Sequence, residues 1–512
     1  MKLFRKDAHF YKKVLILAIP IALQSLIAVG VNMLDTIMVG SIGSSGNVYD
    51  SVILGPLGKT AAELASEQSL AAVSLSNTFI GIYHIFCMGL GMGASVLVSR
   101  YWGMKQKGDD EGEKATTALK QTVCLMLRLT LILATLFAIA TFVMPETIMK
   151  MYAKKQVDLT TVSAGDFERV VAENANNLEI VRRGADYLRY SVITYFFLGT
   201  SLTVTIVLRS VGQALFPLFV SIGALFVNLI ANYTFIFGHF GAERMEVKGA
   251  ALGTLIARVF EAVMIVGYLL VVDKRIRFRI KDFFMKTGSL LKEYIRISIP
   301  VLISDGILAL GNNSVAMVIG RLGSEFTSAN SITAVTQQMS TVGIQGVCQA
   351  GAIVTGQTLG HGDKKKTMQQ GYLFFGLGLA LGLLAALIIL LIKTPIINGY
   401  DVSANTKNLA NQLMIAISII LIFQATNSIM TKGVLRGGGD TKMLMLMDNI
   451  FLWAVALPLG ILAGFVLHLD PFWIYICLKS DQIIKAIWCY FRLKSEKWIK
   501  KISTGTPAAG AK

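Results

Sequence analysis

The sequence predicts an all-α integral membrane protein of about twelve transmembrane helices, arranged as two homologous six-helix lobes. Hydrophobic residues make up 54% of the 512 residues and charged residues only 15%, which leaves too little polar surface to cover a soluble fold. Apolar runs recur along the chain, and many approach the roughly 20 residues that cross a hydrocarbon core of about 30 Å. The two halves also repeat one another, so one lobe architecture is expected twice.

The apolar runs set the order of the predicted elements. Six spans are expected in the first half, at 14–40, 71–99, 121–146, 187–208, 215–238 and 249–271. Six more are expected at 297–320, 329–358, 369–394, 408–431, 443–467 and 472–491. The chain then divides into a lead (1–13), an N-lobe (14–271), a basic linker (272–296), a C-lobe (297–491) and a basic tail (492–512).

The net charge of +17 does not indicate nucleic-acid binding, because the Lys and Arg residues lie in short gaps between apolar runs. Alternate gaps carry most of them, for example at Lys105, Arg275, Lys364 and Arg492. The positive-inside rule then predicts a multi-pass protein of the cell (inner) membrane with both termini in the cytoplasm. The basic start lacks an A-x-A cleavage pattern, so it is interpreted as a lead into the first helix.

The internal repeat is specific in its positions. One constant offset superimposes Pro20, Asn32, Gly40 and Gly43 on Pro300, Asn312, Gly320 and Gly323. Further along, Gly103 matches Gly360 and the Leu208-Arg209 pair matches Leu435-Arg436, each at a smaller offset. The first half therefore carries two extra segments, near 44–69 and 155–184, which are expected in extracellular loops. Six helices per half make this a parallel repeat, and transporters of that type bind substrate between the repeats.

Four motifs, in order along the repeat, resemble the multidrug and toxic compound extrusion (MATE) family from about residue 10 to about residue 500. They are P-x14-D-T-x-x-V-G from Pro20 to Gly40, N-x-x-x-N-Y-x-x-I-F-G from Asn228 to Gly238, G-A-A-L-G-T from Gly249 to Thr254, and L-R-G-x-G-D-T-K from Leu435 to Lys442. The resemblance implies a secondary antiporter that exports small amphipathic, often cationic or aromatic, compounds in exchange for H⁺ or Na⁺.

The resemblance also implies an ion-coupling site in the N-lobe, at Asp35, Asn228, Asn232 and Thr254. Na⁺ would then be held by Asp35, Asn228 and Asn232, and no other cofactor is expected. Some family members carry Asp where Asn232 stands, so H⁺ and Na⁺ both remain open. A flippase of the same superfamily, which moves lipid-linked saccharides, is the alternative function. Such proteins often have a strongly cationic cleft, whereas Arg258 is the only Arg predicted to lie deep in a span.

The residues of this site also have a physical reading of their own. An ionisable side chain such as Asp35, deep in a span, is costly unless it faces a polar cavity or a partner, so a functional role is the default. Asn228 and Asn232 are four residues apart and share one helix face. Their amide oxygens suit a hard cation, while hydrogen bonding between helices is the structural alternative. Thr254 alone more often bonds its own helix backbone.

Other singled-out residues keep two readings. Pro20 could bend the first helix or mark a static start. Glu261 and Arg258, three residues apart, fit an ion pair somewhat better than a second charged site. Asp305 and Asp448 could contact substrate in the C-lobe, but helix caps or partial hydration near helix ends explain them more simply. Asp481 and Lys485 are expected to pair structurally.

No enzyme chemistry is indicated. The five histidines are scattered without ligand spacing, and the five cysteines include no C-x-x-C pair. No G-K-[ST] follows the glycine-rich turn at Arg436, so it is not a phosphate loop. An active transporter of this sequence would have to use an ion gradient. The expected partners are a small-molecule substrate and membrane lipid, with no nucleic acid, and the expected assembly is a monomer.

Overall fold

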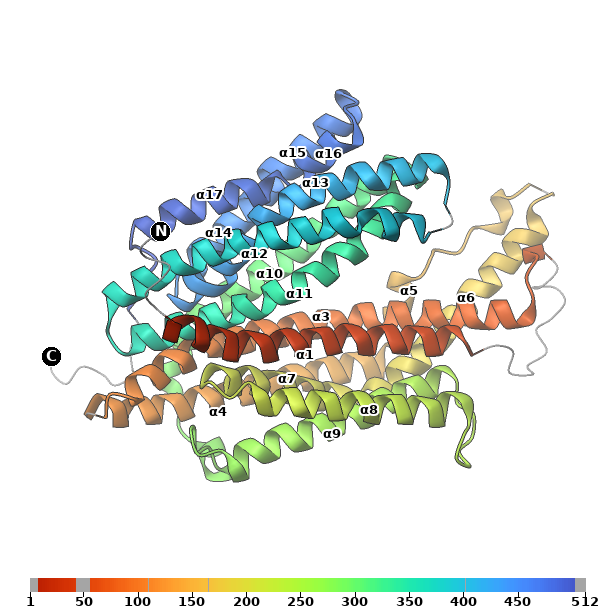
Figure 1. The fold of residues 1–512 in the computed structure, drawn as a ribbon. Helices are drawn as coiled ribbons and strands as arrows, with labels where there is room; N and C mark the ends of the chain where they lie inside the picture. Colours follow the sequence, from red (N-terminus) through yellow and green to blue (C-terminus); the bar gives the residue numbers. More distant parts are fainter. Residues whose placement is uncertain (1–7, 43–55, 109, 164, 401, 502–512) are drawn as a thin grey trace.

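The computed structural model describes residues 8–42, 56–108, 110–163, 165–400 and 402–501, and this part of the chain is helical without strands. Its long helices run side by side as one bundle (Figure 1). One end of the bundle, called here the basic end, carries Lys105, Lys364 and Arg492, where α3 ends, α12 begins and α17 ends. It lies on the left in Figure 1.

The first half contains α1 (Ala8–Gly40), α3 (Ala61–Lys105), α4 (Asp110–Val143), α5 (Pro145–Tyr152), α6 (Phe167–Ser191), α7 (Thr194–Ser210), α8 (Leu215–Phe237) and α9 (Val247–Gly267). The second contains α10 (Gly288–Arg321), α11 (Ser324–Gly360), α12 (Lys364–Asn398), α13 (Ala404–Ser428), α14 (Thr441–Ile450), α15 (Leu457–Ile461), α16 (Pro471–Leu478) and α17 (Ser480–Lys494). Wider π-helical turns extend α9 through Tyr268–Val272 and α13 through Ile429–Leu435, and join α14 to α15 through Phe451–Ala456. Another follows α15 at Leu462–Val466, and short 3-10 turns lie at Leu159–Thr161 and Ile280–Phe284.

Among the described residues, nine helices are long and apolar enough to span a membrane, and the α6–α7 pair, bent by 59°, adds a tenth. Two predicted spans do not pass this test of length and composition. Helix α11 is rich in Ser, Thr, Gln and Gly, and α16 and α17 are short pieces separated at Lys479. Polar α11 is tolerated because it packs inside the protein, against α1, α3 and α13.

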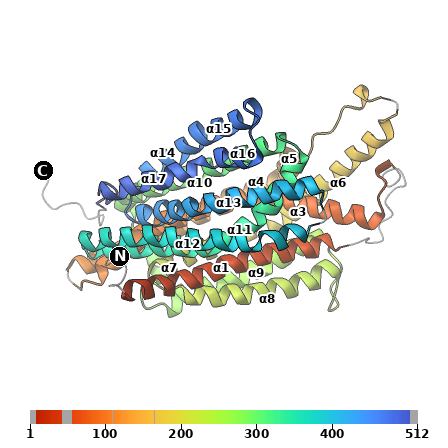
Figure 2. The ribbon, with the colours of Figure 1, turned by 45° about the horizontal axis from the view of Figure 1, so that its top comes forward.

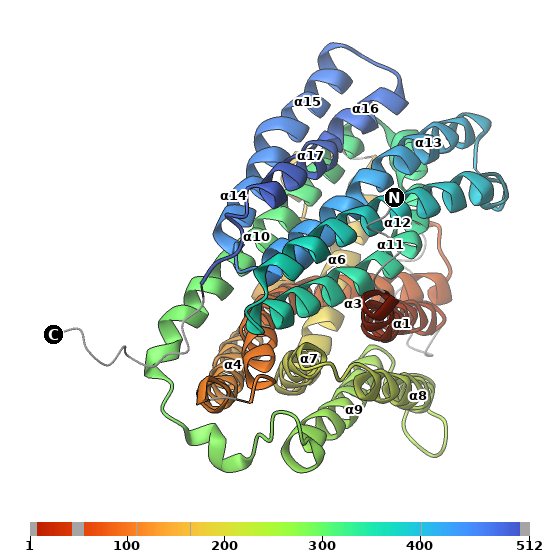
Figure 3. The ribbon, with the colours of Figure 1, turned by 60° about the vertical axis from the view of Figure 1, so that its left-hand side comes forward.

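The two halves form two lobes related as the sequence repeat requires. Within the first lobe α3 packs on α4 and α7, and α8 packs on α9; within the second, α13 packs on α11 and α12. Between the lobes, α1 contacts α11 and α3 contacts α10. By the repeat, α1 corresponds to α10 and α3 to α11, so these two contacts are equivalent. Figure 3 shows the halves as two groups of helices, with α3 beside α11 between them.

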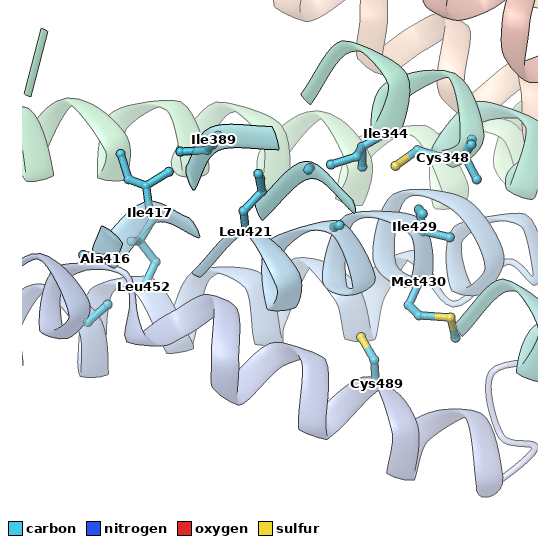
Figure 4. Close-up of a cluster of buried hydrophobic side chains, with 14 of the residues drawn as sticks. Ile344, Cys348, Ile389, Ala416, Ile417, Leu421, Ile429, Met430, Leu452 and Cys489 are labelled. Atoms are coloured by element: carbon cyan, nitrogen blue, oxygen red, sulfur yellow. The ribbon is translucent and has the colours of Figure 1, made fainter. Parts of the chain in front are cut away.

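The C-lobe core is apolar and continuous between its helices. Ile344 and Cys348 of α11, Ile389 of α12, and Ile417 and Leu421 of α13 are all buried in one cluster (Figure 4). Among helices that cross a membrane, such side chains stabilise the lobe by close van der Waals packing, because lipid is as apolar as they are. The same cluster also includes residues of α1, among them Val14 and Ile21, so the core reaches across to the N-lobe.

The lobes are tightly packed near the basic end. A Cβ atom on Gly103 would lie 2.2 Å from the carbonyl oxygen of Gln357, and one on Gly360 would lie 2.2 Å from that of Arg100. Only glycine permits this approach of α3 and α11. The ribbons of the two lobes diverge toward the opposite end (Figure 1).

The two extra segments of the first half were expected to be loops. Their described residues are instead largely helical. Residues 61–69 belong to α3, residues 167–184 belong to α6, and residues 44–55 lie outside the described residues. At about 1.5 Å per residue, the 45 residues of α3 far exceed the roughly 30 Å of a hydrocarbon core. α3 and α6 project together beyond the other helices (Figures 1 and 2). A hydrogen bond of 2.8 Å from Gln68 to Asn176 joins them.

Candidate functional site

A cavity of about 870 Å³ lies within the first lobe. Residues from α1, α3, α6, α7, α8 and α9 line it, and all described lining residues belong to the N-terminal half. Its size falls in the range of small-molecule sites. Asp35 is on its wall, together with Asn228, Thr254, Arg258 and Glu261.

Asp35 of α1 is held by the two asparagines of α8. The amide nitrogen of Asn232 donates to a carboxylate oxygen of Asp35 at 2.5 Å and to the side-chain oxygen of Asn228 at 3.3 Å. Asn228 and Asn232 are both buried. The predicted grouping of these three side chains is therefore present in the geometry, although their role in ion binding stays a prediction.

Helix α9 closes the site from the other side because a glycine permits it. A Cβ on Gly253 would lie 2.1 Å from the side-chain oxygen of Asn232. That oxygen is buried and has no hydrogen-bond partner among the described residues. Thr254, the next residue, lines the cavity. Carboxylate, amide and hydroxyl oxygens are thus collected near one another, and such ligands suit a hard cation.

Arg258 and Glu261 form the ion pair that their spacing predicts, with 2.7 Å between Arg258 Nη1 and Glu261 Oε2. Their side chains keep 33% and 14% of their surface exposed. Both line the cavity and lie one and two turns beyond Thr254 on α9. The pair is therefore an element of the cavity wall.

The other predicted residues lie outside the cavity lining. Pro20 is buried within α1, which continues as a helix through it. Asp305 pairs with Arg436 at 3.2 Å. Asp448 pairs with Lys485 at 3.5 Å. Both acids lie inside helices and bind cations from other helices, so capping does not explain them.

Asp448 also joins the pair of Asp481 and Lys485, which the sequence predicted. Lys485 Nζ is 3.0 Å from Asp481 Oδ2 on α17 and 3.5 Å from Asp448 Oδ1 on α14. All three side chains are almost fully buried. The cluster ties α14 to α17 within the C-lobe.

Arg258 was predicted to be the only Arg deep in a span, and two other arginines are buried without lying deep in one. Arg100 and Arg436 are 3% and 4% exposed. They lie near the basic end, where Arg100 donates to the carbonyl oxygens of Lys500 and Gly438 at 2.5 and 3.2 Å. Arg258 is nevertheless the only Lys or Arg among the described residues that line the cavity. A strongly cationic cleft is therefore not formed there.

Sequence reasoning missed the contribution of α3. Ser74, Asn77, Thr78, Gly81 and His84 all line the cavity. Their spacing of three and four residues places them on one helix face. That periodicity of polar residues within an apolar run was visible in the sequence and could have identified the face.

Comparison with known proteins agrees with this architecture. The chain is 24% identical over 440 residues to "Uncharacterized transporter YisQ" of Bacillus subtilis (strain 168), covering 85% of this chain and 89% of that one. It is 23% identical over 441 residues to "Probable multidrug resistance protein NorM" of Thermotoga maritima, covering 85% and 87%. A solved structure described as the outward-facing conformation of a multidrug resistance MATE family transporter superimposes with a TM-score of 0.74. It is 18% identical and covers 97% of this chain and 98% of that one.

The family model named MatE matches residues 58–234 and 300–462, one segment in each lobe. The first of these segments includes most of α8 with its two asparagines, whereas α9 lies between the two segments. Together they cover well over half of the chain. The chain is therefore a member of the MatE family, a multi-pass membrane transporter related to drug efflux proteins.

Proposed function

We propose that this protein is a secondary antiporter that exports small organic cations in exchange for H⁺ or Na⁺, with Asp35 as the residue that binds the coupling ion. The observation that carries the proposal is the position of Asp35, on the wall of a cavity of about 870 Å³ and hydrogen-bonded to Asn232. A carboxylate in a transmembrane helix that faces a cavity is characteristic of ion and substrate pathways.

Coupling follows from competition for one negative charge. When Asp35 is ionised, the cavity attracts a cationic substrate; when it binds H⁺ or Na⁺, that attraction is lost. An ion and a substrate that favour opposite states drive one another in opposite directions. Asn228, Asn232 and Thr254 would position the carboxylate and supply the remaining oxygen ligands to Na⁺.

Orientation and assembly belong to the same proposal. The basic end would face the cytoplasm by the positive-inside rule, with both termini there and the projecting α3 and α6 outside. The lobes, packed at the basic end, would then stand in an outward-facing state. The described lining residues of the cavity all belong to one lobe of a single chain, so a monomer suffices for transport.

The test is gradient-driven efflux from reconstituted vesicles, with a panel of organic cations that includes ethidium. Imposed pH and Na⁺ gradients identify the coupling ion. Asp35→Asn is expected to abolish gradient-driven efflux, whereas Asp158→Asn, which makes the same change outside the cavity on an exposed turn, is expected to leave it intact. Equal efflux in both variants would remove Asp35 from the mechanism.

Two further outcomes separate the alternatives. Efflux that ignores both gradients would identify a passive channel. No efflux of any cation would favour the flippase, which is then tested by translocation of a lipid-linked saccharide in the same vesicles.

A further inference from the structure

The cavity wall combines many polar side chains with few rings. More than half of the described lining residues are polar or charged, and His84 and Tyr187 supply the only rings among them. Small-molecule sites are usually lined mainly by hydrophobic and aromatic side chains. Most of the surface exposed in this cavity is apolar as well, so the number of polar groups and the scarcity of rings set it apart.

Helix α3 supplies much of this polarity. Ser74, Asn77, Thr78 and His84 are solvent-exposed and lie on one face of the helix, turned to the cavity. We call these four residues the α3 polar stripe. The side-chain hydroxyl of Ser74 and the imidazole of His84 form no hydrogen bond with other described residues, and Asn77 only accepts one, from the Tyr187 hydroxyl at 3.3 Å. The stripe therefore presents unused donors and acceptors.

The stripe is held in place by the projecting helix α6. Arg183 of α6 donates to the Ser69 hydroxyl at 2.9 Å and pairs with Glu246 at 3.4 Å. Ser76, on the buried side of α3, donates to the carbonyl oxygen of Gly184 at 3.2 Å. α6, which lies in an extra segment of the first half, thus supports α3 on the side opposite the stripe.

The charges of the cavity complete the recognition surface. Asp35 and Glu261 contribute two negative charges and Arg258 one positive charge, so the wall carries a net negative charge when Asp35 is ionised. Asn32 of α1 adds an exposed amide on the same wall as Asp35. The combination suits a ligand that is cationic and rich in hydrogen-bonding groups.

We infer that the α3 polar stripe selects a hydrophilic organic cation that carries several hydroxyl, amine or amide groups, in preference to a lipophilic aromatic cation. The inference rests on the proposed function for its transport role, but it concerns recognition alone. A site built to hydrogen-bond its ligand discriminates strongly against analogues that leave its polar groups unpaired.

The experiment measures binding, so that it stands apart from transport. Purified full-length protein is titrated by equilibrium dialysis with two radiolabelled monocations, N-methylglucamine and tetraphenylphosphonium. The first carries many hydroxyl groups and the second has only phenyl rings. N-methylglucamine is expected to bind more tightly by roughly tenfold or more, the effect of one or two net hydrogen bonds.

Variants of the α3 polar stripe, compared with a matched control, test whether the stripe causes the preference for N-methylglucamine. Thr78→Val and Asn77→Leu are expected to remove most of it. Thr135→Val is the control, because Thr135 is also exposed and its hydroxyl bonds the carbonyl oxygen four residues back, as that of Thr78 does. The control is expected to keep the wild-type ratio, and thermal unfolding of each variant confirms that it is folded.

The outcomes separate the two proposals. Tighter binding of tetraphenylphosphonium, or an unchanged ratio in folded Thr78→Val and Asn77→Leu proteins, would overturn the inference while leaving the antiporter intact. A preference for N-methylglucamine that these variants remove would establish it, even if gradient-driven efflux failed and the antiporter were withdrawn.

Discussion

At the scale of single residues, variants of the ion pair in the cavity test whether the pair has a structural or a functional role. Glu261→Gln leaves the Arg258 guanidinium unpaired and removes one negative charge from the wall. If the pair sets the cavity charge, this variant weakens binding of an organic cation several-fold, and Arg258→Gln does not. The double variant restores the net charge and is expected to bind nearly as the wild type does.

A double-mutant cycle on Kd provides the measurement. A purely structural pair gives another pattern, in which both single variants lower the thermal unfolding temperature alike and the cation affinity follows stability. That pattern would exclude the pair from recognition.

The surroundings of a residue in a span could be predicted from the sequence where burying its side chain in the membrane costs much free energy. Asp35 had to find a partner or a cavity, and the structure gives it both. The partners of Asp448 could not be inferred, because they depend on how α14 meets α17, which no local pattern encodes. Ser74 and Thr78 were overlooked for a related reason, since a Ser or Thr hydroxyl in a span costs little when it can bond its own helix backbone, as that of Thr78 does.

At the scale of elements, the buried Lys485 cluster joins two helices of the C-lobe. Lys485→Met would leave Asp481 and Asp448 buried without their cation. Breaking a buried pair in this way costs about 3–5 kcal/mol, so a large drop in thermal unfolding temperature in detergent is expected. Lys248→Met, which breaks a more exposed pair with Asp186, should cost about 1 kcal/mol or less.

Equal effects of the two substitutions would show that the cluster is hydrated and contributes little. Part of this cluster was predicted from the sequence. Asp481 and Lys485 were recognisable as a pair because both lie on one helix, four residues apart. Helical spacing encodes such contacts, while contacts between helices need the assembled lobe.

The extra segments show where element prediction failed. Residues 155–184 were expected in a loop because they are extra to the repeat. α6 forms there because it has a buried face, which includes Ala172, Val181 and Ala185, and contacts α3, α5 and α9. A helix with a wide polar face and a narrow apolar face has a weak hydrophobic pattern. Such a helix is hard to recognise in a sequence dominated by long apolar runs that face lipid. The span 329–358 was predicted correctly as a helix, although α11 is rich in polar residues.

At the scale of the whole molecule, the internal repeat predicts which residues meet near the pseudo-two-fold axis. Gly103 and Gly360 are equivalent by sequence, and each lies against the backbone near the other. Gly103→Ala is expected to separate the lobes at the basic end and destabilise the packed state. Gly320→Ala is the control, because a Cβ there meets nothing within 4 Å.

The contact of Arg100 with the C-lobe acts at the same scale. Its guanidinium belongs to α3 of the N-lobe, and it donates to the carbonyl oxygens of Gly438 and Lys500, which follow the C-lobe helices. The segment around Lys500 is itself fixed by Trp498, which is fully buried, and by a hydrogen bond from the Lys500 amide to Gly438 at 2.9 Å. One charged side chain thus connects the lobes at the basic end.

Arg100→Gln is therefore expected to favour opening at that end. Hydrogen bonds to a charged group contribute about 1.5–3 kcal/mol, so their loss shifts the equilibrium between states by roughly tenfold or more. The measurement is the alkylation rate of Ser99→Cys, placed at the lobe interface beside Gly356, in a protein whose five native cysteines are replaced. Arg128→Gln is the matched control, because Arg128 of the N-lobe donates to the carbonyl oxygen of Phe283 in the linker rather than to a C-lobe residue. Faster alkylation in Arg100→Gln alone would identify Arg100 as part of the gate, whereas equal rates in all three proteins would assign it to static packing.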